Sequence, residues 1–176
     1  MGWTNATTRS TGNLITASIW NTDLVDNMDF LETQDFYAPT TVRYTGAAFV
    51  ALAASGNYPA AILSGATQFA LTSFHCPANF SAIVTSVLIV IPTSTQASAN
   101  WDIESHYAAN GEAYNTHSES DTVTTYNVTA QQLFEVDVSG ILSSLAADDY
   151  VGLKLLQSTA SHTVNVIGFY MKYTIG

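Results

Sequence analysis

Three side chains that could ligate a metal alternate along the short run 101–107: Asp102, Glu104 and His106. Strict alternation predicts a half-buried strand with these three on one face, where carboxylate and imidazole groups could hold a divalent cation. Alternation alone also produces such triplets on any solvated strand face, and we favour that interpretation. We therefore assign no metal site and expect no cofactor.

The residue types of nucleophilic catalysis are present but are not brought together by any motif. His75 and Cys76 are adjacent, so on a strand they would point in opposite directions and could not form a dyad. Histidines and serines are available, yet the sequence contains no Gly-x-Ser-x-Gly elbow. We expect no catalytic residues and a protein that is not an enzyme. A small hydrolase is the weakest alternative.

Aromatic residues could support a second kind of function, the binding of sugar rings by stacking. Trp101, Tyr126 and Tyr170 could form such a platform, although aromatic side chains in strands usually belong to the core. Asn5, Asn79 and Asn127 each begin a match to the glycosylation acceptor pattern, which we ascribe to coincidence because Ser and Thr are abundant.

Composition excludes several classes of function. Only 10% of the 176 residues are charged, and the net charge is -10 with four basic residues, Arg9, Arg43, Lys154 and Lys172. This balance argues against direct binding to nucleic acid or to an anionic membrane. Cys76 is the single cysteine, so no internal disulfide can form. We expect no signal peptide and no membrane span, because the longest apolar run, 87–91, is far shorter than about 20 residues.

Strand patterns fill the chain after residue 40. They occur at 41–45, 61–63, 68–74, 82–91, 101–107, 122–129, 133–138, 150–156 and 164–175. We expect an exposed loop at 110–121, one helical turn at 139–145, and inward side chains in the last strand at Ile167, Phe169, Met171, Tyr173 and Ile175. Strands spaced by roughly 10 to 15 residues predict an antiparallel β-sandwich, with the jelly roll as the preferred topology.

The first 40 residues have a different pattern. Residues 1–10 are predicted to be an extended arm that contains Trp3. Thr16 would cap a following helix, while Ile15 and Trp20 have the spacing of a hydrophobic staple. Residues 34–40, which include Pro39, would close the helix and turn the chain.

The predicted helix has one apolar stripe to bury. We therefore divide the chain into an N-terminal arm and docking helix, 1–40, and a β-sandwich domain, 41–176. The predicted interface residues are Trp3, Ile15, Trp20, Leu24, Met28 and Leu31.

This N-terminal segment also carries a resemblance. The runs 11–17, 20–21, 25–27 and 30–31 resemble a segment near the start of small virion structural proteins of tailed bacteriophages. The body is similar in pattern, with an early strand at 69–74 and a closing aromatic strand at 167–173. The resemblance implies a jelly roll that assembles as a trimer on the head or tail surface.

The sequence therefore predicts a virion structural protein, most simply a capsid decoration or accessory protein made in the host cytoplasm and carried on the virion surface. Its expected partners are copies of itself, preferably in a homotrimer, and other virion proteins such as the major capsid protein. The alternative is a carbohydrate-binding jelly-roll module of a receptor-binding or tail-tip protein.

Overall fold

The computed structural model describes residues 32–44, 49–50, 52–158 and 162–176. The predicted N-terminal helix lies outside these residues. So do all the predicted interface residues: Trp3, Ile15, Trp20, Leu24, Met28 and Leu31. No helix in the described part of the chain is long and apolar enough to cross a membrane.

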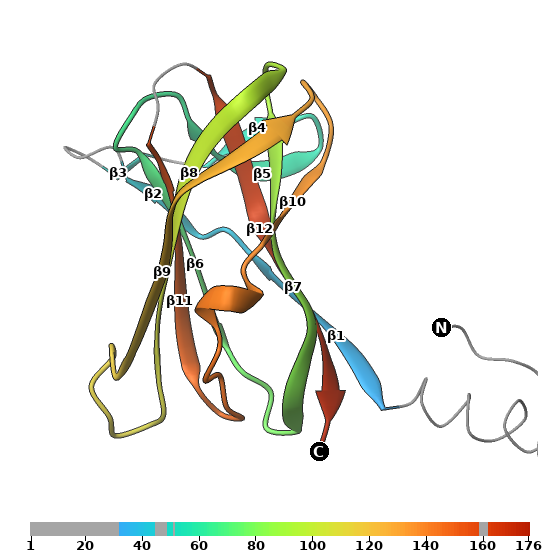
Figure 1. Cartoon of the computed structure of the whole chain (residues 1–176), viewed down its shortest axis with the longest axis vertical. Coiled ribbons are helices and arrows are strands. Elements are labelled where there is room, and N and C mark those ends of the chain that lie inside the picture. Colours follow the sequence, from blue (N-terminus) through green and yellow to red (C-terminus); the bar gives the residue numbers. More distant parts are fainter. Residues whose placement is uncertain (1–31, 45–48, 51, 159–161) are drawn as a thin grey trace, which may run out of the picture.

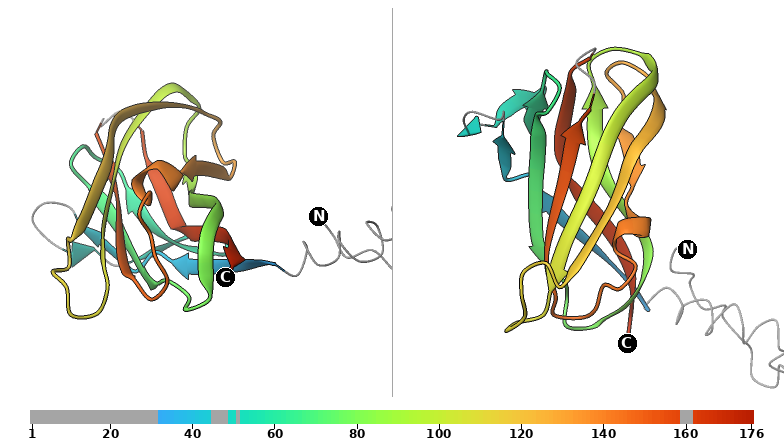
Figure 2. Two further views of the ribbon diagram at one scale, coloured as in Figure 1. Left: turned by 60° about the horizontal axis from the view of Figure 1, so that its bottom comes forward. Right: turned by 60° about the vertical axis from the view of Figure 1, so that its left-hand side comes forward.

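The described residues form two six-stranded antiparallel sheets that face each other (Figures 1 and 2). The first sheet has the order β10 (Phe134–Asp137), β7 (Phe80–Pro92), β12 (Val164–Ile175), β5 (Tyr58–Leu63) and β4 (Ala53–Ser55), and β1 (Thr33–Pro39) also pairs with β12. The second has the order β3 (Phe49–Val50), β2 (Val42–Tyr44), β6 (Phe69–His75), β11 (Tyr150–Gln157), β8 (Gln96–Ala108) and β9 (His117–Val128). The chain is thus mainly β, a jelly-roll-like antiparallel sandwich as the sequence predicted.

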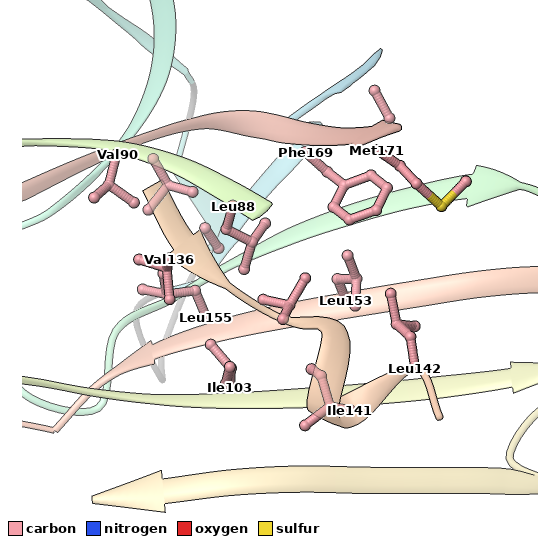
Figure 3. Close-up of a cluster of buried hydrophobic side chains, with 14 of the residues drawn as sticks. Leu88, Val90, Ile103, Val136, Ile141, Leu142, Leu153, Leu155, Phe169 and Met171 are labelled. Carbon is pink, nitrogen blue, oxygen red and sulfur yellow. The ribbon is translucent and has the colours of Figure 1, made fainter. Parts of the chain in front are cut away.

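The core fills the space between the two sheets because apolar side chains alternate along the strands. Figure 3 shows Leu88 and Phe169 of the first sheet facing Ile103 and Leu153 of the second. The short 3-10 helix η2 (Ser139–Ile141) follows β10 and lies within the predicted helical turn 139–145. Its buried Ile141 and the adjacent Leu142 join the same cluster; together they help to fill the space between the layers.

Strand β1 corrects the interpretation of residues 34–40 as a turn. Thr33–Pro39 pairs antiparallel with β12. Phe36 points towards the core, where its ring centre lies 5.3 Å from that of Phe74, and Ala38 is buried. Pro39 is tolerated because β1 pairs with β12 alone and is therefore an edge strand. The sandwich therefore begins before the boundary that the change of sequence pattern suggested.

A β-bulge corrects the inward position predicted for Ile167. The register between β12 and β7 shifts between Val166 and Gly168, so that Val166 and Phe169 both face the main core. Ile167 packs instead into a separate small cluster with Ala60 and Ile91. The prediction is confirmed for Phe169, Met171 and Tyr173, which follow the bulge and are buried.

The predicted loop at 110–121 is shorter in the structure, because β9 already begins at His117. Strand β9 lies at the edge of its sheet and exposes much of its length to water. Its residues are therefore mostly serine, threonine and acidic ones, and the sequence at 117–121 resembles a polar loop. The connection between β8 and β9 consequently comprises residues 109–116, which project from one end of the sandwich (Figure 2).

Candidate binding groove

The outer face of the second sheet carries three strands whose outward positions lie in register. On β11, the exposed Gly152 lies opposite Ser73 of β6 on one side and His106 of β8 on the other. Two positions further along β11, Lys154 lies between Leu71 and Glu104. Strand pairing alone therefore brings hydroxyl, imidazole, ammonium and carboxylate groups onto one surface.

A groove of 680 Å³ lies over these rows. The outer faces of β6, β11 and β8 form its floor, and the loop 109–116 contributes a wall. Gly152 is in the middle of the floor, and a side chain at this outward position would extend into the groove. The volume falls within the range of small-molecule sites, about 300 to 1,000 Å³.

Two tyrosines stand at one end of the groove. Tyr150 is 59% exposed and Tyr114 is 76% exposed. Each ring has an imidazole at its edge: the centre of His75 lies 4.7 Å from that of Tyr150, and the centre of His106 lies 5.8 Å from that of Tyr114. Exposed tyrosines offer a ligand an apolar face together with a polar hydroxyl.

An ion pair marks the other end. The Lys154 Nζ atom lies 2.8 Å from Glu104 Oε2 and 5.3 Å from the centre of the Phe69 ring. Both charged side chains are partly shielded, at 28% exposure for Lys154 and 35% for Glu104. Their charges largely cancel, while the remaining lone pairs and protons can still make hydrogen bonds to a ligand.

The alternating residues Asp102, Glu104 and His106 do share the outer face of β8, as the sequence predicted. Glu104 of that triplet is engaged by Lys154, and His106 faces Tyr114. Among the described residues, no group of three or more His, Cys, Asp or Glu side chains is placed to hold a metal ion.

The suggested aromatic platform of Trp101, Tyr126 and Tyr170 is not formed. Trp101 is fully buried, and its ring stacks on that of Tyr126 with the centres 5.1 Å apart. Tyr170 lies on β12 of the other sheet, where its hydroxyl donates a 2.9 Å hydrogen bond to Asp35. Trp101 and Tyr126 serve packing, the use that the sequence favoured, whereas Tyr170 makes an exposed hydrogen bond.

The side chains of His75 and Cys76 lie on opposite sides of the chain, as expected for adjacent residues of a strand. His75 is exposed, whereas Cys76 is completely buried. Burial, with smaller contributions from the negative charges of Asp149 and Asp148, raises the pKa of the Cys76 thiol to about 12. The thiolate needed for nucleophilic attack is therefore scarce at neutral pH.

Sequence reasoning missed the two groove tyrosines. Tyr114 is the one large aromatic residue in an otherwise polar connection, and an exposed position there was a usable signal. Tyr150 begins a strand whose outward residues include Gly152 and Lys154. Which residues of β6 and β8 lie beside them depends on the strand register, and no local sequence pattern reveals that register.

No protein family model matches the sequence, and no curated protein matches it. Solved structures similar to this one include the carbohydrate-binding module CBM36 in complex with calcium and xylotriose, with 12% identity, a TM-score of 0.43, and coverage of 79% of this chain and 98% of that one. A CBM36-1 domain of a multidomain xylanase from the hindgut metagenome of Trinervitermes trinervoides has 8% identity, a TM-score of 0.41, and coverage of 78% and 96%. A family two carbohydrate esterase from Cellvibrio japonicus has 8% identity and a TM-score of 0.39, with coverage of 81% of this chain and 34% of the esterase. All three are distant likenesses.

Proposed function

We propose that the sandwich is a non-enzymatic carbohydrate-binding module of a virion receptor-binding or tail-tip protein. The observation that carries the binding function is the groove over β6, β11 and β8, where exposed Tyr114 and Tyr150 stand beside a polar floor. This combination matches the chemistry of a sugar, which has an apolar ring face and a rim of hydroxyl groups.

The two ends of the groove would contact different parts of a sugar. The Tyr114 and Tyr150 rings supply flat apolar surface for the carbon-bound hydrogens of a sugar ring. Ser73, His106 and the Glu104–Lys154 pair supply donors and acceptors for hydroxyl groups. A few polar groups within an otherwise apolar concavity are typical of small-molecule sites.

The chemistry of the groove favours binding over catalysis. Glycoside hydrolysis usually needs two carboxyl groups, one of them protonated as the acid. Glu104 has its charge balanced by Lys154, and Glu112 accepts a 3.1 Å hydrogen bond from the Ala109 amide in its own loop. Both carboxyl groups are therefore already engaged within the protein.

The virion assignment rests on the N-terminal resemblance. We assign attachment to the particle to residues 1–31 and glycan recognition to the sandwich, in a homotrimer displayed on the virion surface. A capsid decoration protein is the second candidate, favoured by the same N-terminal segment. Decoration requires retention on purified particles without any sugar binding, whereas the module that we propose requires both.

A glycan array followed by titration calorimetry tests the binding function. We expect saturable binding to an oligosaccharide on the array, weakened about tenfold or more by Tyr150→Ala or Tyr114→Ala, because each change removes a stacking surface. Tyr58→Ala is the matched control, since Tyr58 is 46% exposed on β5 of the other sheet. Absence of saturable binding, or an equal loss in the Tyr58 variant, would rule out this groove as the binding site.

A further inference from the structure

The charges of the groove point to the class of sugar that it accepts, provided that the proposed glycan binding is correct. Among the described residues that line the groove, Lys154 is the only lysine or arginine, while Glu104 and Glu112 are acidic. Lys172, the other basic side chain whose surroundings are described, lies on β12 of the opposite sheet. Lys154 is therefore the one ammonium group that the described lining offers to an acidic sugar.

That partner is already engaged. The 2.8 Å contact between Lys154 Nζ and Glu104 Oε2 balances the ammonium charge, and the Phe69 ring lies beneath the same group. A sugar carboxylate approaching Lys154 would meet the Glu104 carboxylate at close range. Repulsion between like charges is strong where side chains are partly shielded from water. The net charge of the whole chain, -10, adds to this repulsion at longer range.

A neutral sugar meets no such barrier. Its hydroxyls can donate to the Glu104 carboxylate and accept from the Lys154 ammonium without separating the pair. From Tyr150 to Lys154 the floor extends about 13 Å along β11, at about 3.3 Å per residue. This length exceeds a single sugar ring, so the floor suits a short chain of sugars with one end on the tyrosines and the other on the ion pair.

We infer that the groove selects neutral oligosaccharides over acidic ones, and that Glu104 is the residue that enforces this selection. Glu104 excludes acidic sugars in two ways: it pairs with the one ammonium group of the described lining, and it places a negative charge on the floor. Removal of its charge should free Lys154 and admit a sugar carboxylate.

The test compares binding to matched sugars, such as lactose with sialyllactose and galactose oligomers with galacturonic acid oligomers. We expect the unaltered chain to bind neutral members only. Glu104→Gln should raise the ratio of acidic to neutral binding by about tenfold or more, because an unpaired ammonium then lines the groove. Lys154→Met should leave acidic sugars excluded, since the Glu104 carboxylate remains.

Glu135→Gln is the control for net charge, because it removes the same charge from an exposed position on β10 of the other sheet. It should leave the ratio unchanged within about twofold. An equal gain in the Glu135 and Glu104 variants would overturn the role of Glu104. If the unaltered chain binds acidic and neutral sugars alike, the selection is overturned while glycan binding stands. If it binds no member of the panel or of the array, the proposed function and this inference fail together.

Discussion

The Tyr107 hydroxyl donates a 2.6 Å hydrogen bond to the carboxylate of Glu119, connecting the buried side of β8 to the edge strand β9. The same carboxylate accepts a 2.8 Å hydrogen bond from the Ser143 hydroxyl and a 3.1 Å bond from the Ser143 amide. The Tyr107 oxygen in turn accepts a 3.0 Å bond from the Ser144 amide. One acidic group thereby connects β9 to the segment that follows η2.

This arrangement predicts sensitivity to acid. Burial alone would raise the pKa of Glu119, but the hydrogen bonds from Tyr107 and Ser143 outweigh it and hold the pKa below the usual value for glutamate. A carboxyl group whose pKa is lowered by folding stabilises the fold above its unfolded pKa, about 4.3, and this contribution is lost as the pH falls through the folded value.

We therefore expect the melting temperature to fall more steeply on acidification below about pH 4.3 in the unaltered chain than in Glu119→Gln, which cannot ionise. Calorimetric melts across this range compare the two. Curves that run parallel would show that Glu119 contributes nothing to the acid sensitivity.

Two truncations test where the sandwich begins. Removal of residues 1–31 keeps β1 and the 2.8 Å hydrogen bond from the Ile175 amide to the Glu32 carbonyl, so we expect strand-like circular dichroism and an unchanged melting temperature. Removal of residues 1–40 takes away β1 with its buried Ala38 and should destabilise the fold strongly. Equal melting temperatures for the two truncated chains would contradict the structural role of β1.

Among the glycines that the structure describes, Gly168 has the least room. A Cβ atom there would lie 2.6 Å from the Ala38 carbonyl oxygen and 2.7 Å from the Tyr37 hydroxyl. Gly168→Ala should cost about 1–3 kcal/mol of unfolding free energy, because backbone must move to relieve the contact. Gly140→Ala is the control, since no atom lies within 4 Å of its Cβ. Urea denaturation measures both, and equal stabilities would refute the crowding at Gly168.

Cys76 should be inert in the folded protein. Its burial and its pKa of about 12 leave it as a neutral thiol at pH 8. We expect a thiol reagent such as DTNB to react slowly with the native chain and stoichiometrically after denaturation. Rapid labelling of the native chain at the rate of an exposed thiol would disprove the buried position.

Trp20 is the position in the N-terminal segment where we expect the strongest docking contact, because it is both the staple partner of Ile15 and a predicted interface residue. Trp20→Ala should abolish attachment to the particle while changing the melting temperature little. Phe169→Ala is the contrasting variant, because Phe169 is fully buried with its ring centre 4.6 Å from that of Phe74, and its loss should cost about 3–5 kcal/mol. Equal effects of the two changes on attachment and melting would remove the docking role.

The fold was predictable because its strands repeat simple patterns. Alternation placed β8, and continuous apolar sequence placed β7. The predictions were wrong where contacts with distant parts of the chain, rather than the local sequence pattern, decided the structure. The bulge at Ile167 moves the side chain to the other face, and the adjacent Gly168 was the one mark of it in the sequence. Strand β9 is polar because water covers much of it.

The groove was less predictable than the fold. Glu104 and His106 were recognised as neighbours on one face, but the partner that neutralises Glu104 is Lys154, from a strand 50 residues away. Trp101 and Tyr150 are both aromatic strand residues, yet one is fully buried and the other is 59% exposed. Only the three-dimensional register decides between these two outcomes.

The position of β12 also bears on the kinetics of folding. This strand pairs with β7 along most of its length and with β5 and β1 on successive stretches, so it connects segments from both ends of the described chain. Contacts between distant segments form only after large loops have closed, and folds dominated by such contacts fold slowly. Until β12 is in place, the edges of β1, β5 and β7 are unpaired and can pair with other chains, which leads to aggregation. We therefore expect efficient refolding only at high dilution, where such encounters are rare.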